Sequence, residues 1–405
     1  MNDARPPVTR PAPRVAFVCG AICDGGTTTF LVNLGGELAR RGMAVEVFSA
    51  EKYNPHEADF RTLGIRTIVQ DHHRRIYEDR ILATLMALRD FDPQIVIASH
   101  AAAPFEILRY LPTGLRKIGV VHIDTPAIYQ FLLHYAREVD GMVCVSQRIS
   151  ANLKAQPAFA AVPVHCINYG VPMPASAATR ALTTEPLRLL YLGRLERAQK
   201  RTHLFPAILK DLATAGIPLH WTIAGDGPEA GYLQETLGAS DKNQIVSLIG
   251  KVPYPKVPEL LQRHDIFLLA SVAEGLPLSL VEAMGAGLVP VVSDLESGIR
   301  EVVDDTTGIL VPVDNIAGYA RGIVFLHEHR ERLRSMSIAA QARVRERCSI
   351  PAMADRWMPL LSAPVAEHLN WPERWAIQAP LTCPNSLTFS HPARILRRFK
   401  KRLGI

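Results

Sequence analysis

Short hydrophobic runs alternate with amphipathic segments along most of the chain. In the first half, the runs that predict strands are Arg14–Gly20, Ala44–Ser49, Thr67–Gln70, Ile95–Ser99, Ile118–His122 and Met142–Ser146. Between some of these runs, Thr28–Arg41 and Ile81–Arg89 have the spacing of amphipathic helices. This alternation is typical of a parallel sheet that is covered by helices on both faces.

The alternation stops near residues 170–186, which are rich in proline and in small or polar residues, and this composition predicts a linker. The strand pattern then resumes at Leu187–Leu192, His220–Ala224, Val246–Ile249, Ile266–Ala270, Val289–Ser293 and Gly308–Val311. We therefore expect an α/β chain with two Rossmann-like, doubly wound parallel-sheet domains. They should face a cleft at the carboxyl ends of their strands. The expected boundaries are a first domain at 1–172, a linker at 173–186, a second domain at 187–362 and an extension at 363–405.

Composition excludes several classes of protein. The 405 residues are 48% hydrophobic and 21% charged, as in a soluble globular protein, and not as in a disordered chain, a collagen or a coiled coil. No apolar run reaches the roughly 18 residues that span a bilayer. The run Val15–Cys23 resembles the core of a signal peptide but has no cleavage site, so it predicts a strand. The six cysteines form no CxxC pair, which indicates reduced thiols in a cytoplasmic protein.

The positive charge is concentrated at the carboxyl end. Residues 391–405 contain six cations and no acid, which equals the whole net charge of +6. Apolar residues form one helical stripe there, so the tail could lie on an anionic membrane surface. A helix packed on the first domain, or a solvated tail, would give the same pattern. The neutral remainder argues against a nucleic-acid-binding protein.

Two motifs in the first half resemble ligand sites. Residues 20–27 match a phosphate-binding P-loop except that Gly26 replaces its lysine, which argues against a nucleoside triphosphatase. Gly25 and Gly26 remain compatible with a tight turn capped by Thr27 or Thr28, or with close approach of a ligand. The acidic pair in residues 90–92 matches an Asp-x-Asp metal motif. However, Pro93 follows directly, which favours a helix end, and we expect no metal.

The second half carries more specific candidates. Gly193, Arg194 and Lys200 follow a predicted strand, where two cations could neutralise a diphosphate or could be solvated loop charges. Gly225 and Gly227 follow the next strand and would allow a base or ribose to lie against the backbone.

Residues 271–285 form the strongest motif. A short loop with Glu274 precedes a helix that begins near Pro277 and contains Glu282. The two carboxylates could bind vicinal hydroxyls of a sugar and a ribose. Alternatively, Glu274 could be a helix N-terminal charge and Glu282 a solvated helix residue. The apolar neighbours of Glu282 argue for a buried helix, in which an unpaired glutamate is costly.

In this order, the Gly193-Arg194…Lys200 pair, Gly225-x-Gly227 and Glu274-x7-Glu282 resemble the retaining GT-B glycosyltransferases of family 4, also called group 1. Further similar stretches are Gly25-Gly26, Val145-Ser146, Asn168-Tyr-Gly170-Val171 and Gly298-Ile-Arg-Glu301. The resemblance covers residues 14–362 and departs from the common pattern at Arg201, where glycine is usual.

This resemblance implies roles for individual residues. Arg194 and Lys200 would hold the diphosphate, Glu274 the donor sugar and Glu282 the ribose, while Lys251 and Val252 would border the base. Further donor contacts would come from Gly25, Gly26, Gly193, Gly225, Gly227, Gly275, Leu276 and Leu278. His122 matches a first-domain histidine near the reaction centre, although a single histidine at a strand end is more often structural.

We therefore expect a metal-independent glycosyltransferase without a cofactor. It would move a sugar from a nucleoside diphosphate sugar to a saccharide acceptor, with retention of configuration as the family implies. The acceptor is expected to be lipid-linked, which would suit an enzyme bound to the cytoplasmic face of a membrane through residues 391–405. The alternatives are a GT-B sugar-nucleotide epimerase and a catalytically silent sugar-nucleotide-binding membrane protein.

Overall fold

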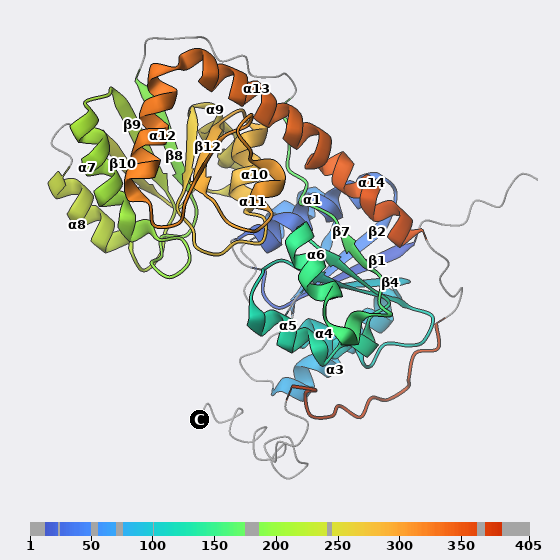
Figure 1. Ribbon diagram of the computed structural model, residues 1–405. Coiled ribbons are helices and arrows are strands. Elements are labelled where there is room, and N and C mark those ends of the chain that lie inside the picture. Colours follow the sequence, from blue (N-terminus) through green and yellow to red (C-terminus); the bar gives the residue numbers. More distant parts are fainter. Residues whose placement is uncertain are drawn as a thin grey trace, which may run out of the picture.

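The computed structural model describes residues 13–22, 25–49, 56–69, 76–99, 101–174, 186–240, 245–362 and 369–382. It contains a seven-stranded and a six-stranded sheet in separate lobes (Figure 1). All strand pairs in both sheets are parallel. The predicted pair of Rossmann-like sheets is therefore confirmed.

The first sheet has the order β3-β2-β1-β4-β5-β6-β7. Its strands are β1 Arg14–Cys19, β2 Ala44–Ser49, β3 Arg66–Val69, β4 Ile95–Ser99, β5 Arg116–Val121, β6 Gly141–Cys144 and β7 Val164–Cys166. The helices and 3-10 turns among them are α1 Gly26–Arg40, α2 Glu57–Thr62, α3 Tyr77–Phe91, α4 Ala102–Leu108, α5 Pro126–Leu133, η1 Ala136–Glu138, α6 Gln147–Lys154 and η2 Pro157–Phe159. The edge strand β7 was not predicted, because its three residues are too few to give an alternation.

The second sheet has the order β10-β9-β8-β11-β12-β13. Its strands are β8 Leu187–Leu192, β9 Leu219–Ala224, β10 Val246–Gly250, β11 Ile266–Leu269, β12 Val289–Ser293 and β13 Ile309–Val311. The helical elements are η3 Thr202–Leu204, α7 Phe205–Ala215, α8 Ala230–Ser240, η4 Tyr254–Lys256, α9 Val257–Gln262, α10 Leu278–Gly285, α11 Ile299–Val302, α12 Ile316–Glu328, α13 Arg330–Arg347 and α14 Ile350–Leu361. The first and last residues of each predicted strand lie within two residues of those of the corresponding observed strand.

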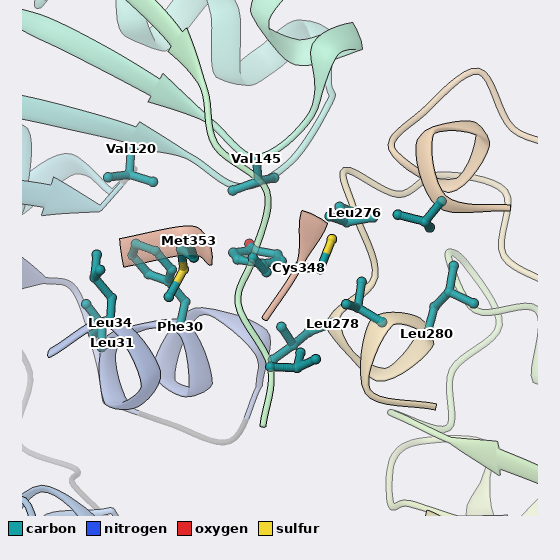
Figure 2. Packing of buried hydrophobic residues seen from close by; sticks show 14 of the residues in the cluster. Phe30, Leu31, Leu34, Val120, Val145, Leu276, Leu278, Leu280, Cys348 and Met353 are labelled. Atoms are coloured by element: carbon teal, nitrogen blue, oxygen red, sulfur yellow. The ribbon is translucent and has the colours of Figure 1, made fainter. Parts of the chain in front are cut away.

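The last helix returns to the first lobe. α13 and α14 run from the second sheet towards the first (Figure 1), and α14 packs beside α1. Asp355 on α14 forms an ion pair with Arg41 at 2.7 Å, and the backbone nitrogen of Gly170 lies 3.1 Å from the sulfur of Met353. Figure 2 shows the resulting apolar core, which extends from α1 past Met353 to the start of α10. Burial of these side chains joins the two lobes.

Two local expectations are tested by these elements. α3 ends at Phe91, and Asp92 adopts a left-handed conformation (φ 50°) with its carboxylate bound to Arg14 and to the indole nitrogen of Trp371. The helix-end interpretation of residues 90–92 is therefore confirmed. The expected cap by Thr27 or Thr28 is wrong, because α1 begins at Gly26, two residues before the predicted start, with Gly25 as its N-cap and no side-chain cap.

Residues 369–382 lie against the first lobe. The indole nitrogen of Trp375 donates to the carbonyl of Tyr110, and the backbone nitrogen of Leu381 donates to the buried carboxylate of Glu106. The basic tail at 391–405, which the sequence predicts to be helical, lies outside the described residues. Among the residues that are described, no helix is both long and apolar enough to cross a bilayer.

Candidate active site

The candidate residues of the second sheet come together because of its strand order. β9, β8 and β11 are neighbours, so the loops that follow them meet at one edge of the sheet. These loops carry Gly225, Arg194 and Glu274, respectively. Ligands bind at this edge in open α/β sheets.

The two glycines after β9 are required by backbone packing. A Cβ atom at Gly225 would lie 1.8 Å from the carbonyl oxygen of Gly193, and one at Gly227 would lie 2.3 Å from that of Leu195. Both glycines also have positive φ angles, 150° and 154°. Their positions let the loop after β9 support the loop after β8, so a structural role explains them without a ligand.

Lys200 and Glu274 form a largely buried ion pair. The distance between Nζ and Oε1 is 2.5 Å, and the side chains are 15% and 7% exposed. Gln199 donates from Nε2 to the carbonyl of Ala273 at 2.8 Å and so holds the two loops together. A buried pair of this kind is costly to break on one side only, because the remaining charge is left without its partner.

Arg194 does not join this pair. Its side chain is 62% exposed, and its guanidinium lies 3.8 Å from the carboxylate of Glu196. Arg201, at the position where the family commonly has glycine, has a φ of 55°. That left-handed conformation explains the usual glycine. Here an ion pair with Asp314 holds the arginine side chain.

The start of α10 contacts the first lobe. A Cβ atom at Gly275 would lie 2.4 Å from the carbonyl oxygen of His122. One at Gly26, the first residue of α1, would lie 3.5 Å from Cβ of Leu278. Leu276 and Leu278 are buried at this contact (Figure 2). The N-terminal ends of α1 and α10, each with backbone N–H groups that lack helical partners, therefore lie close together.

His122 follows β5 and is buried beside Tyr169, a residue that sequence reasoning did not assign to the site. Its Nδ1 lies 2.7 Å from the Tyr169 hydroxyl, and the two rings are stacked at 5.8 Å. Burial is the main cause that raises the pKa of Tyr169, and the nearby carboxylate of Glu274 is the second. This tyrosine therefore stays neutral between the histidine and the carboxylate. Its only signal in the sequence was its place in the Asn168–Val171 stretch.

Glu282 lies on α10 beside a second contact between the lobes. Burial raises the pKa of Glu282 to about 8. The Tyr254 hydroxyl donates a hydrogen bond to Oδ1 of Asn33 on α1 at 3.0 Å. Burial is the main cause that raises the pKa of Tyr254, and the negative charge of Glu282 is the second. Lys251 and Val252, which come shortly before Tyr254 in the sequence, are exposed and partly buried, respectively. The sequence did not single out Tyr254 or Asn33, because their partners lie more than 200 residues apart.

The described residues contain no group of three or more His, Cys, Asp or Glu side chains that could hold a metal ion. The structure thus brings Lys200, Glu274, His122 and the start of α10 together at the contact between the lobes. Arg194 lies at the same sheet edge with its side chain turned to solvent. Such an arrangement can bind an anionic group through Lys200 and the helix terminus, and hydroxyl groups through Glu274.

Comparisons with known proteins identify the family and the fold. Residues 24–173 match the model of "Glycosyltransferase Family 4", and residues 186–329 match that of "Glycosyl transferases group 1". WcaL of Escherichia coli K12, whose name describes a colanic acid biosynthesis glycosyltransferase, is 34% identical over 143 residues. That alignment covers 34% of this chain and 35% of WcaL, so the chain spans about a third of this relative's length.

Two sets of solved structures share the fold. Staphylococcus aureus TarM, in complex with UDP and other ligands, matches with a TM-score of 0.73 at 12% sequence identity. The match covers 86% of this chain and 100% of the TarM chain. Anabaena HepE, in complex with UDP and glucose, matches with a TM-score of 0.69 at 14% sequence identity. The match covers 87% of this chain and 100% of the HepE chain. The two family matches flank the linker and include every strand of both sheets except β1, and this chain belongs to the family 4, or group 1, glycosyltransferases with the GT-B fold.

Proposed function

We propose that this protein transfers a sugar from a nucleoside diphosphate sugar to a saccharide acceptor, with retention of configuration at the anomeric carbon. The observation that carries the proposal is the buried Lys200–Glu274 pair at the start of α10, opposite His122. UDP is the first nucleotide to test, since TarM and HepE are described in complex with it.

The largest energetic requirement of this reaction is stabilisation of the departing diphosphate. In the proposed mechanism, Lys200 and the backbone N–H groups at the start of α10 bind its oxygens, and the exposed Arg194 turns inward as a second cation. Glu274, which is released from Lys200 as the phosphates arrive, accepts hydrogen bonds from the donor sugar. Glu282 does the same for the ribose. These roles require no metal.

The acceptor is proposed to be a growing, lipid-linked saccharide. Support comes from the similarity to WcaL, whose name refers to colanic acid biosynthesis, and from a 25% identical yeast relative named as a phosphatidylinositol N-acetylglucosaminyltransferase subunit. The basic residues at 391–405 would bring the enzyme to an anionic membrane surface where such an acceptor resides.

The proposal is tested by a thermal-shift screen against nucleoside diphosphates and their sugars, because a ligand that binds the folded state raises the melting temperature. The donor found in this way is then incubated with saccharide acceptors, and the anomeric configuration of the product is determined by NMR. We expect nucleoside diphosphate release that depends on the acceptor. Release of an epimerised sugar without an acceptor would identify an epimerase. Binding without turnover would identify a silent sugar-nucleotide-binding protein.

A further inference from the structure

A cavity of about 440 Å³ lies where the two lobes meet, and none of the candidate active-site residues lines it. We call it the junction cavity. Four arginines line it: Arg300, Arg343, Arg347 and Arg356. The acids Glu301 and Asp304 also line it, so positive charge is in excess.

Among the residues that the structure describes, two of the four guanidinium groups have a carboxylate partner. Arg300 binds Asp294 through two hydrogen bonds of 2.7 and 3.0 Å, and Arg343 binds Asp304 at 2.5 Å. Arg347 donates to a backbone carbonyl, that of Glu301, at 3.3 Å. Arg356 has no hydrogen bond or ion pair with any residue that the structure describes. Arg347 and Arg356 are both exposed, and neither guanidinium has a carboxylate partner within the described part of the chain. Both line the same cavity, where one anion would pair with the two charges.

The arginines come from both lobes. Arg356 is on α14, which packs on α1 of the first lobe, whereas Arg347 is on α13 beside the second sheet. Glu301 already connects the lobes here, because its carboxylate accepts hydrogen bonds from the Gln147 backbone nitrogen (2.5 Å) and from Asn168 Nδ2 (3.0 Å). An anion bound between Arg347 and Arg356 would add a second connection.

The chemistry of the junction cavity indicates its ligand. Guanidinium groups match the oxygens of a phosphate group in a fork geometry. The volume lies within the range of about 300–1,000 Å³ typical of small-molecule sites, and exceeds what inorganic phosphate needs. We propose that the junction cavity binds a phosphorylated small molecule, with Arg347 and Arg356 on its phosphate, and that this binding fixes the two lobes relative to each other.

The test separates this cavity from the diphosphate site proposed at Lys200. Titration calorimetry at low ionic strength measures the binding of inorganic phosphate, and of pyrophosphate as a larger probe, to the Arg194→Ala/Lys200→Ala variant. We expect saturable binding in this background. Adding Arg356→Gln or Arg347→Gln should weaken it by about tenfold or more, since each change removes a charge-assisted contact. Arg334→Gln, an exposed position on α13 outside the cavity, is the matched control and should bind normally.

Thermal melting provides a second readout that is independent of transferase activity. Phosphate should raise the melting temperature of the background and of the Arg334 control, but not that of the Arg356 and Arg347 variants. Melting without phosphate checks that each variant is folded. Arg356→Lys keeps the charge without the fork and should bind with intermediate affinity. Absence of saturable binding in the background, or unchanged affinity in both arginine variants, would overturn the proposal.

Discussion

The α-carbon of Gly275 faces the carbonyl oxygen of His122 so closely that a Cβ atom there would lie 2.4 Å from that oxygen. The two residues belong to different lobes and approach each other beside the Lys200–Glu274 pair. A side chain at position 275 would have to push the lobes apart. The geometry of the proposed site therefore depends on this glycine.

We predict that Gly275→Ala lowers kcat/KM by about 100-fold, because a displacement of roughly 1 Å in a catalytic site has an effect of this size. It should also lower the unfolding free energy by about 1–3 kcal/mol through overpacking. Gly231→Ala is the matched control, since a Cβ atom there meets no other atom within 4 Å. Steady-state kinetics and urea denaturation measure both effects. Full activity in Gly275→Ala would show that the contact can shift freely.

The strands and their parallel, doubly wound arrangement were accessible from the sequence, since buried parallel strands are continuous apolar runs between turn residues. The order of the strands within each sheet was not predicted. The motif around Glu274 and Glu282 was also accessible, because its residues are contiguous in the sequence. Contacts such as Tyr254–Asn33 and His122–Tyr169 were not. Tyr254–Asn33 depends on how the lobes are oriented, and His122–Tyr169 depends on the packing of the segments that follow β5 and β7 within the first lobe. No local pattern encodes either contact.

The sequence also left ambiguous why certain glycines are present. Gly225 and Gly227 were candidates for contact with a nucleotide, and the structure shows a backbone carbonyl in the place of any side chain. Arg194 and Lys200 were predicted as a pair of cations. In the described part of the chain, Lys200 pairs with the buried carboxylate of Glu274, whereas the side chain of Arg194, two residues after the end of β8, extends into solvent.

Lys200 is predicted to contribute to binding of the donor. We expect Lys200→Met to reduce kcat/KM for the donor at least tenfold, because a charge-assisted hydrogen bond contributes about 1.5–3 kcal/mol. Glu274 would lose its partner, so thermal melting must confirm that the variant is folded. Lys210→Met, exposed on α7, should remain active. Kinetics of Lys200→Met equal to those of the control would exclude Lys200 from the site.

Glu282 should make stability depend on pH. Its pKa is about 8 in the folded protein because of burial, against an ordinary value of 4.5. Between these values the unfolded chain releases the proton and the folded chain keeps it, so the unfolding free energy should fall as pH rises from about 5 to 8. Glu282→Gln should remove this fall, which we expect to be a few kcal/mol at most. Urea denaturation at pH 5 and pH 8 measures it, with the exposed Glu235→Gln as control. Parallel curves for wild type and Glu282→Gln would contradict the prediction.

Transfer is predicted to persist in excess chelator. Lys200 and the start of α10 supply the positive charge in the proposed mechanism, and Asp92 is engaged by Arg14 and Trp371. Initial rates should therefore agree with and without EDTA after dialysis. Loss of activity that magnesium or manganese restores would show that a metal ion takes part.

The basic tail is predicted to hold the protein on anionic membranes. Residues 369–382 are anchored on the first lobe through Glu106 and Tyr110, so a truncation that removes only residues 391–405 leaves these contacts intact. Each of the six cations near an anionic surface contributes about 1 kcal/mol, and this attraction is screened by salt. We expect the full chain to float with phosphatidylserine-containing liposomes at low salt, and not at high salt or with neutral liposomes. The truncated chain should stay in solution under all three conditions while keeping its melting temperature. A full chain that does not float at low salt would favour a tail that packs on the protein or remains solvated.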